Sequence, residues 1–248
     1  MCRPGTAAAA AVVIAVTIAL ALRAISRVQV ETEGGGADAP LIGPRVRAWY
    51  RGLMGPFEVS MVRSGVSPDT LTYAQLVVSV LAGAAFWQGA AFLGGWLTIL
   101  AGTLDILDGG VARRGAGATR RGALVDSVID RWAEFATFVG LGAFFRDTWV
   151  LFVVALAAFG SLMVSYTRAR AEGLGIELQL GRAQRPERYV ILGFGGFISG
   201  LLAHLRCSEP GPAGHGVLAA AIVLLAILST WTALTRARHA AALLGRSP

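Results

Sequence analysis

The stretch that decides the fold is residues 105–130, which read DILDGGVARRGAGATRRGALVDSVID. It carries four aspartates, Asp105, Asp108, Asp126 and Asp130, within sequence that is otherwise apolar enough for a membrane. An ionisable residue in an apolar span is energetically expensive and is by default functional. This cost disfavours the alternative in which the four aspartates are helix caps or surface charges.

Helical spacing groups these aspartates with small residues. Residues three or four apart share a helix face, which predicts one stripe of Asp105, Asp108, Gly109 and Ala112. A second stripe contains Gly122, Asp126 and Asp130. Residues 114–121 contain two glycines and predict a turn. Two antiparallel helices joined there would direct all four carboxylates into one gap.

Carboxylates packed together in a low dielectric repel one another unless cations neutralise them. Oxygen ligands favour Mg²⁺ or Mn²⁺ over zinc, and no His or Cys lies nearby in the sequence. Two such ions can clamp a diphosphate and stabilise phosphoryl displacement. We therefore expect Asp105, Asp108 and Asp126 to hold metal. The small side chains leave room for a bulky ligand, and Arg113 can neutralise phosphate oxygens.

Composition predicts an all-α integral membrane protein of one domain. Hydrophobic residues make up 55% of the chain, charged residues 15%, and mean hydropathy is +0.62. A soluble domain has about 25% charged residues. The net charge of +7 would suggest nucleic acid in a soluble protein. Here the arginines flank apolar spans, so anionic lipid headgroups and phosphate ligands are the better partners.

The N-terminal part predicts three segments. Residues 1–27 form an extra hydrophobic helix; a signal peptide and a wrongly assigned start codon are the alternatives. Residues 28–40 are a linker containing three consecutive glycines. Residues 41–64 are amphipathic and suit a helix in the membrane interface, which Pro44 could start. Ser67 or Asp69 can then cap the next helix.

A six-helix core is expected over 65–240, followed by a loose tail at 241–248. Arginines gather on one side of the spans, whereas the other side has only Arg146 and Arg206. The positive-inside rule places both ends of the core, and the aspartate gap, on the cytoplasmic side of a cell membrane. The six predicted spans are 68–88, 93–113, 120–145, 148–172, 187–206 and 215–237.

A second group of charged residues surrounds the loop between the fourth and fifth spans. Arg168, Arg170 and Glu172 precede that loop, and two further arginines, Arg185 and Arg188, follow it. Ordinary flanking charge is the simpler explanation. The one-turn spacings and the shared cytoplasmic loop instead favour a forked site for a phosphorylated acceptor.

The pattern Asp-x2-Asp-Gly-x2-Ala-Arg-x8-Gly-x3-Asp-x3-Asp resembles the signature of the CDP-alcohol phosphotransferases, membrane enzymes of phospholipid synthesis. The resemblance implies that a CDP group is lined by Gly109, Ala112, Arg113 and Gly122, with Thr72 in the nearby segment 65–72. It also implies a homodimer and a juxtamembrane helix that clamps the core. Relatives usually carry Asn where Asp69 stands, which leaves the role of Asp69 open.

The resemblance implies that an acceptor hydroxyl attacks the β-phosphorus of a CDP-linked lipid such as CDP-diacylglycerol, releasing CMP. Asp130 would complete the second metal site or accept the hydroxyl proton. The strings around Arg168 and Arg185 are similar to those of phosphatidylinositol-phosphate synthases, which puts inositol 1-phosphate first as acceptor. Glycerol 3-phosphate, free inositol and serine are alternatives. An ion-coupled transporter and an inactive lipid-binding relative are the other classes considered.

Overall fold

The computed structural model describes residues 23–26, 41–115, 119–178, 181–206 and 211–245. Every regular element in these ranges is a helix, which confirms the predicted all-α class. The elements are α2 (Pro44–Arg63), α3 (Pro68–Trp87), α4 (Ala91–Arg114), α5 (Arg120–Phe144), α6 (Val150–Glu172), α7 (Arg185–Leu205), the short 3₁₀ helix η1 (Pro212–His215) and α8 (Gly216–Leu244).

Five helical segments in the described part of the chain are long and apolar enough to cross a membrane. They are α3, α4, α6, α7 and the continuous segment Pro212–Leu244. The predicted third span is also a long helix, α5, but it does not meet the same standard because charged residues crowd its first fifteen positions. The count of six spans therefore stays a prediction. The extra helix predicted at 1–27 lies outside the described residues apart from 23–26.

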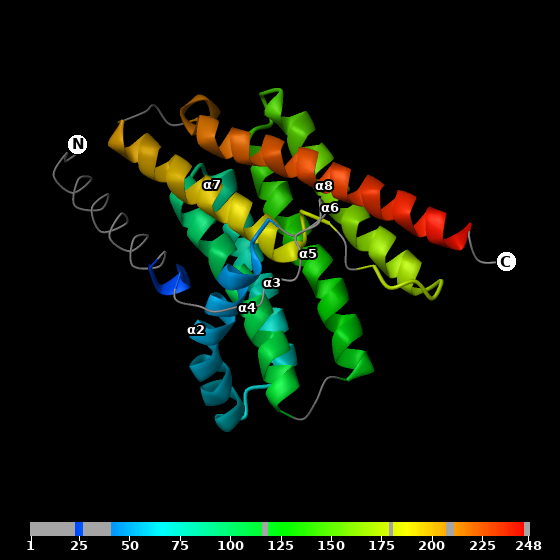
Figure 1. Cartoon of the computed structure of the whole chain (residues 1–248). Coiled ribbons are helices and arrows are strands. Elements are labelled where there is room, and N and C mark those ends of the chain that lie inside the picture. The colour runs from blue at the N-terminus through cyan, green and yellow to red at the C-terminus, as the bar shows by residue number, and fades with distance from the viewer. Residues whose placement is uncertain (1–22, 27–40, 116–118, 179–180, 207–210, 246–248) are drawn as a thin grey trace.

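The helices pack as a chain of neighbours (Figure 1). Helix α3 contacts both α4 and α5, α4 contacts α7, α7 contacts α8, and α8 contacts α6. Glycines allow the closest approaches: Gly83 of α3 lies against Gly140 of α5, and Gly95 of α4 lies against Gly193 and Gly196 of α7. As a result, α3 holds the two aspartate-bearing helices, α4 and α5, in fixed positions.

The main apolar core lies at the end of the bundle away from the aspartates. Phe86, Phe138, Leu141 and Ile222 are buried there, at the C-terminal ends of α3 and α5 and near the start of α8. Many large apolar side chains elsewhere are exposed, including Trp132, as expected for helices that face lipid. The carboxylate-bearing end has a second, smaller apolar cluster, in which Met54, Leu71, Leu107 and Val111 are buried between α2, α3 and α4.

Helix α2 lies against the core as a clamp. It begins at Pro44, as predicted, and its Tyr50 hydroxyl is hydrogen-bonded to the Thr103 hydroxyl of α4 at 2.7 Å. Nearer its C-terminus, the Glu58 carboxylate accepts from Nε of Arg114 at 2.6 Å. These contacts fix α2 along the part of α4 that carries the aspartates.

The last helix is longer than expected. We predicted a span ending at residue 237 and a loose tail from 241, whereas α8 continues to Leu244. The added residues include Ala240–Leu244, which are strong helix formers, and Gly245 follows them. The prediction placed the end at the basic residues and overlooked this propensity.

Candidate active site

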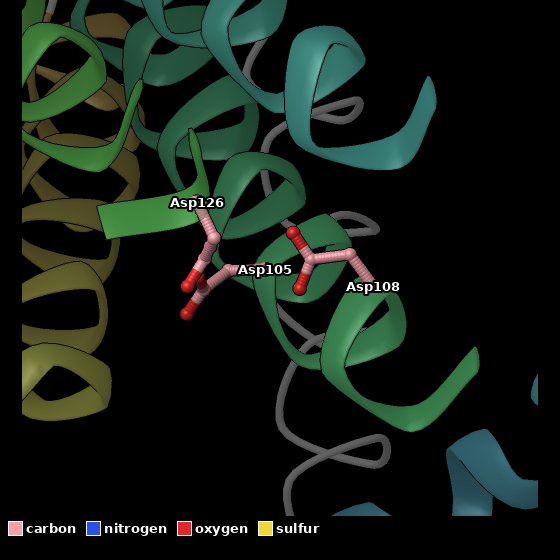
Figure 2. Close-up of side chains that lie close together, drawn as sticks. All are labelled: Asp105, Asp108 and Asp126. Atoms are coloured by element: carbon pink, nitrogen blue, oxygen red, sulfur yellow. The ribbon is translucent and has the colours of Figure 1, made fainter. Parts of the chain in front are cut away.

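Three carboxylates converge where α4 and α5 approach each other. Asp105 and Asp108 come from α4 and Asp126 comes from α5 (Figure 2). One oxygen from each lies within 4.8 Å of the others. The two α4 residues are three apart and so share a face. The structure thus brings together three of the four aspartates that the sequence pattern singled out.

Asp108 is held rigidly from two directions. Its Oδ2 accepts a hydrogen bond from the Thr72 hydroxyl at 2.8 Å, and its Oδ1 accepts from the Gly109 backbone N–H at 2.6 Å. Thr72 lies in the first turns of α3, whose N-cap is Ser67, one of the two predicted capping residues. The cap therefore fixes the start of α3 and, through Thr72, one carboxylate of the cluster.

The donor set fits a divalent cation. All three groups offer carboxylate oxygen, which Mg²⁺ and Mn²⁺ prefer. Asp126 Oδ1 is buried and has no hydrogen-bond partner among the described residues. A buried carboxylate oxygen without a donor is costly unless a cation neutralises it. The cluster is therefore chemically suited to a metal ion.

The fourth aspartate lies just outside this cluster. Asp130 is 2% exposed, and its carboxylate contacts the guanidinium of Arg185, while Gln75 Nε2 and Arg131 Nη1 each approach it at 3.3 Å. Arg185 also places Nη1 at 2.7 Å from Asp105 Oδ1. The structure thus links Asp130 to the cluster through an arginine. Its predicted role as a ligand or base stays a prediction.

A cavity of about 860 Å³ opens beside these acids. Of the four arginines predicted to bind an acceptor phosphate, Arg168, Arg185 and Arg188 line it. Arg170 is exposed and is not among the lining residues, because positions two apart on a helix face different sides.

Sequence reasoning did not assign three further arginines to this cavity. Arg47, Arg131 and Arg236 line it from α2, α5 and α8. Arg236 is 4% exposed and donates from Nη1 to the Val164 carbonyl at 2.8 Å. Burial of an arginine inside a long apolar helix was an available signal, whereas the other two depend on how distant helices meet.

Of the residues expected around a CDP group, Thr72 is buried against Asp108, and the other four are half-buried or exposed. Gly109 and Ala112 are half-buried on α4, and Arg113 is exposed one residue further on. A Cβ on Gly109 would lie 3.0 Å from Arg113 Nη1, so the absence of a side chain lets the guanidinium fold back over this face. Gly122 is half-buried at the start of α5 and donates its N–H to the Thr119 hydroxyl at 3.0 Å.

Asp69, whose role the sequence left open, does not provide the helix cap. It lies in the first turn of α3, and its Oδ2 pairs with Arg121 Nη1 at 2.9 Å. Both side chains are substantially exposed, so the pair adds little stability. It does join the start of α3 to the start of α5, next to Gly122.

The model of the CDP-alcohol phosphatidyltransferase family matches residues 65–244, nearly three quarters of the sequence. The chain belongs to this family. Membership excludes the ion-coupled transporter considered above: this CDP-alcohol phosphatidyltransferase is a membrane transferase of phospholipid metabolism.

Two synthases of phosphoinositol lipids are among the relatives of this transferase. The archaetidylinositol phosphate synthase of Methanothermobacter thermautotrophicus is 35% identical over 174 residues, covering 70% of this chain and 83% of its own. The phosphatidylinositol phosphate synthase of Streptomyces avermitilis is 35% identical over 169 residues, covering 63% and 69%.

Solved structures show the same fold. A crystal structure of Mycobacterium tuberculosis phosphatidylinositol phosphate synthase with CDP-DAG bound superposes with a TM-score of 0.64 at 28% identity, covering 76% of this chain and 94% of that one. Another crystal structure of that protein contains manganese and citrate. The family is metal-dependent, which agrees with the donor set of the three-carboxylate cluster.

Proposed function

We propose that this transferase moves a phosphatidyl group from CDP-diacylglycerol to a hydroxyl of inositol 1-phosphate and releases CMP. The observation that carries the proposal is the arginine-lined cavity beside the three-carboxylate cluster, with Arg185 in contact with acids on both sides. A phosphorylated acceptor accounts for this concentration of arginine better than serine or free inositol does. The names of the similar synthases support the same acceptor.

Asp105, Asp108 and Asp126 would hold metal, and Asp130 would complete the site of a second ion. Both ions would be Mg²⁺, for which Mn²⁺ could substitute. When bound, these ions neutralise the diphosphate and make its β-phosphorus more electrophilic. The exposed Arg113, whose guanidinium lies over Gly109 next to Asp108, would contact phosphate oxygens. The small residues Gly109, Ala112 and Gly122, together with Thr72, would line the CDP group.

The acceptor would bind on the other side of Asp130. Arg168, Arg185 and Arg188 offer the guanidinium groups for its phosphate, whereas Arg170 is exposed and does not line the cavity. The acceptor hydroxyl oxygen forms a bond to the β-phosphorus, the bond from that phosphorus to the CMP oxygen breaks, and Asp130 accepts the hydroxyl proton. Deep burial keeps Asp130 out of bulk water, and Arg185 limits its orientation.

We also propose that the chain lies in the cell membrane with its active site facing the cytoplasm, because of the positive charges around the cavity. The arginines that line the cavity lie at one end of the bundle. The positive-inside rule places such an end on the cytoplasmic side of a cell membrane. We further propose that the enzyme works as a homodimer, as the family resemblance implies.

The decisive test offers radiolabelled CDP-diacylglycerol to the purified chain with a panel of acceptors, with and without Mg²⁺. Inositol 1-phosphate is expected to drive CMP release, and chelation of divalent ions is expected to stop it. Glycerol 3-phosphate is the second candidate, because the same arginines suit its phosphate. Preference for serine or free inositol would contradict the proposal that the cavity binds a phosphorylated acceptor. Undiminished CMP release after chelation would contradict the metal site.

A further inference from the structure

Glu134 of α5 makes a paired contact with Arg188 of α7. Arg188 Nε lies 2.7 Å from Glu134 Oε1, and Nη2 donates to Oε2 at 3.3 Å. The arginine side chain is 4% exposed and the glutamate 17%. The 3.3 Å contact is a hydrogen bond and the 2.7 Å contact is a close ion pair, and two contacts to one carboxylate limit both the position and the plane of the guanidinium group. The contact therefore determines where the third nitrogen of Arg188 lies.

That third nitrogen, Nη1, is buried and has no hydrogen-bond partner among the described residues; Nε also lacks a hydrogen bond there, but it lies against the Glu134 carboxylate. Arg188 also lines the 860 Å³ cavity. Buried donors are nearly always satisfied, so one left without a partner in the wall of a polar cavity indicates a ligand that supplies an acceptor. Its positive charge selects an anionic oxygen.

Helices α5 and α7 form a second pair of a carboxylate and an arginine one turn away. On α5, Asp130 and Glu134 are four residues apart, and on α7, Arg185 and Arg188 are three apart. Asp130 pairs with Arg185, and Glu134 pairs with Arg188. One acidic face of α5 therefore positions both arginines of α7, and Glu134 extends the stripe of Gly122, Asp126 and Asp130 by one further turn.

We propose that Glu134 is a positioning residue for the acceptor: it holds the Arg188 guanidinium so that Nη1 remains available to the acceptor's phosphate oxygen. The inference rests on the proposed function, because it requires a phosphorylated acceptor in this cavity. A purely structural ion pair would affect folding stability but would not discriminate between the two substrates. The Michaelis constants separate these cases.

The test compares Glu134→Gln, Arg188→Gln and the double variant in the CMP-release assay, with KM measured for inositol 1-phosphate and for CDP-diacylglycerol. Each single change is expected to raise the acceptor KM about tenfold, the scale of one charge-assisted hydrogen bond, and to leave the lipid KM within about twofold. Because Glu134 acts through Arg188, the double variant should be no worse than Arg188→Gln alone.

Two further variants keep the test interpretable. Asp147→Asn removes a carboxylate from an exposed ion pair just beyond the C-terminal end of α5 and should change neither KM. Glu134→Asp keeps the charge on a shorter side chain and should give an intermediate acceptor KM, which provides a measurement if the glutamine variant does not fold. Equal rises in both KM values, or additive effects in the double variant, would overturn the positioning role.

The variants would give a different kinetic result if the proposed function itself were wrong. If Arg188→Gln itself leaves the acceptor KM unchanged, the cavity does not bind the acceptor phosphate, and the inference about Glu134 fails with it. If Arg188→Gln raises the acceptor KM while Glu134→Gln does not, the acceptor site is correct and only the positioning role is wrong.

Discussion

Replacing Gly140 by alanine tests whether the crossing of α3 and α5 holds the active site together. A Cβ at this position would meet the backbone of Gly83, with Cα of Gly83 only 2.5 Å away. Carbon atoms in contact prefer about 3.5–4.0 Å, so the two helices would have to separate by about 1 Å. The nearest atoms all belong to the backbone of Gly83, which has no side chain that could turn away.

Two opposing effects determine how much the free energy of unfolding should change. Overpacking of this kind costs about 1–3 kcal/mol, and the higher end applies because backbone meets backbone. Alanine is favoured over glycine within a helix by about 1 kcal/mol. The free energy of unfolding should therefore fall by about 1–2 kcal/mol, which lowers Tm by about 2–8 °C in a chain of this size.

The same separation should reduce activity, because α3 carries Thr72 and Gln75, while α5 carries Asp126 and Asp130. A displacement of about 1 Å at reacting groups can cost roughly 100-fold in rate, so CMP release should fall by up to about that factor.

Gly142 provides the matched control for this variant on the same helix. A Cβ there would lie 3.6 Å from Leu151 Cδ1 and 3.8 Å from Val154 Cγ1, which are ordinary contacts. Gly142→Ala should therefore gain helix propensity without strain and be at least as stable as the natural chain. Thermal unfolding in detergent and CMP release measure both variants. Equal stability and activity of Gly140→Ala and Gly142→Ala would refute the reasoning.

Three other substitutions probe single contacts. Asp130→Asn should abolish turnover but leave CDP-lipid binding intact in a ligand-binding assay; unchanged turnover would remove Asp130 from the chemistry. Thr72→Val deletes the 2.8 Å hydrogen bond to Asp108 and should weaken Mn²⁺ binding about tenfold, measured by paramagnetic resonance, whereas Thr72→Ser should restore it. Arg47→Ala leaves the Glu187 carboxylate, 1% exposed, without its arginine partner, and should lower the unfolding free energy by about 3 kcal/mol; a loss below about 1 kcal/mol would show that other donors compensate.

Sequence periodicity predicted the helices and the meeting of three of the four aspartates, because both follow from local rules. Spacing of three residues placed Asp105 and Asp108 on one face of α4, and Asp126 of the next helix, α5, lies beside them. The capping role of Ser67 and the start of α2 at Pro44 were readable for the same reason. Each depends on a few neighbouring residues.

Contacts between distant helices could not be predicted in this way. The pairing of Asp130 with Arg185 depends on how α5 and α7 meet, 55 positions apart in the sequence. The buried Arg236 entered the cavity wall because α8 packs against α6, which no local spacing specifies. Arg170 shows the converse: its residue type suited a phosphate site, but its helix face did not.

The cavity wall has a consequence for how fast the enzyme captures its substrate. Of the described lining residues, six are arginines and three are carboxylates, an excess of three positive charges. Such a field attracts anionic molecules from solution and raises their association rate, and dissolved salt screens it over about 8–10 Å. Encounter with a phosphorylated metabolite should therefore slow as ionic strength rises, whereas an uncharged polyol would be captured at nearly the same rate in dilute and concentrated buffer.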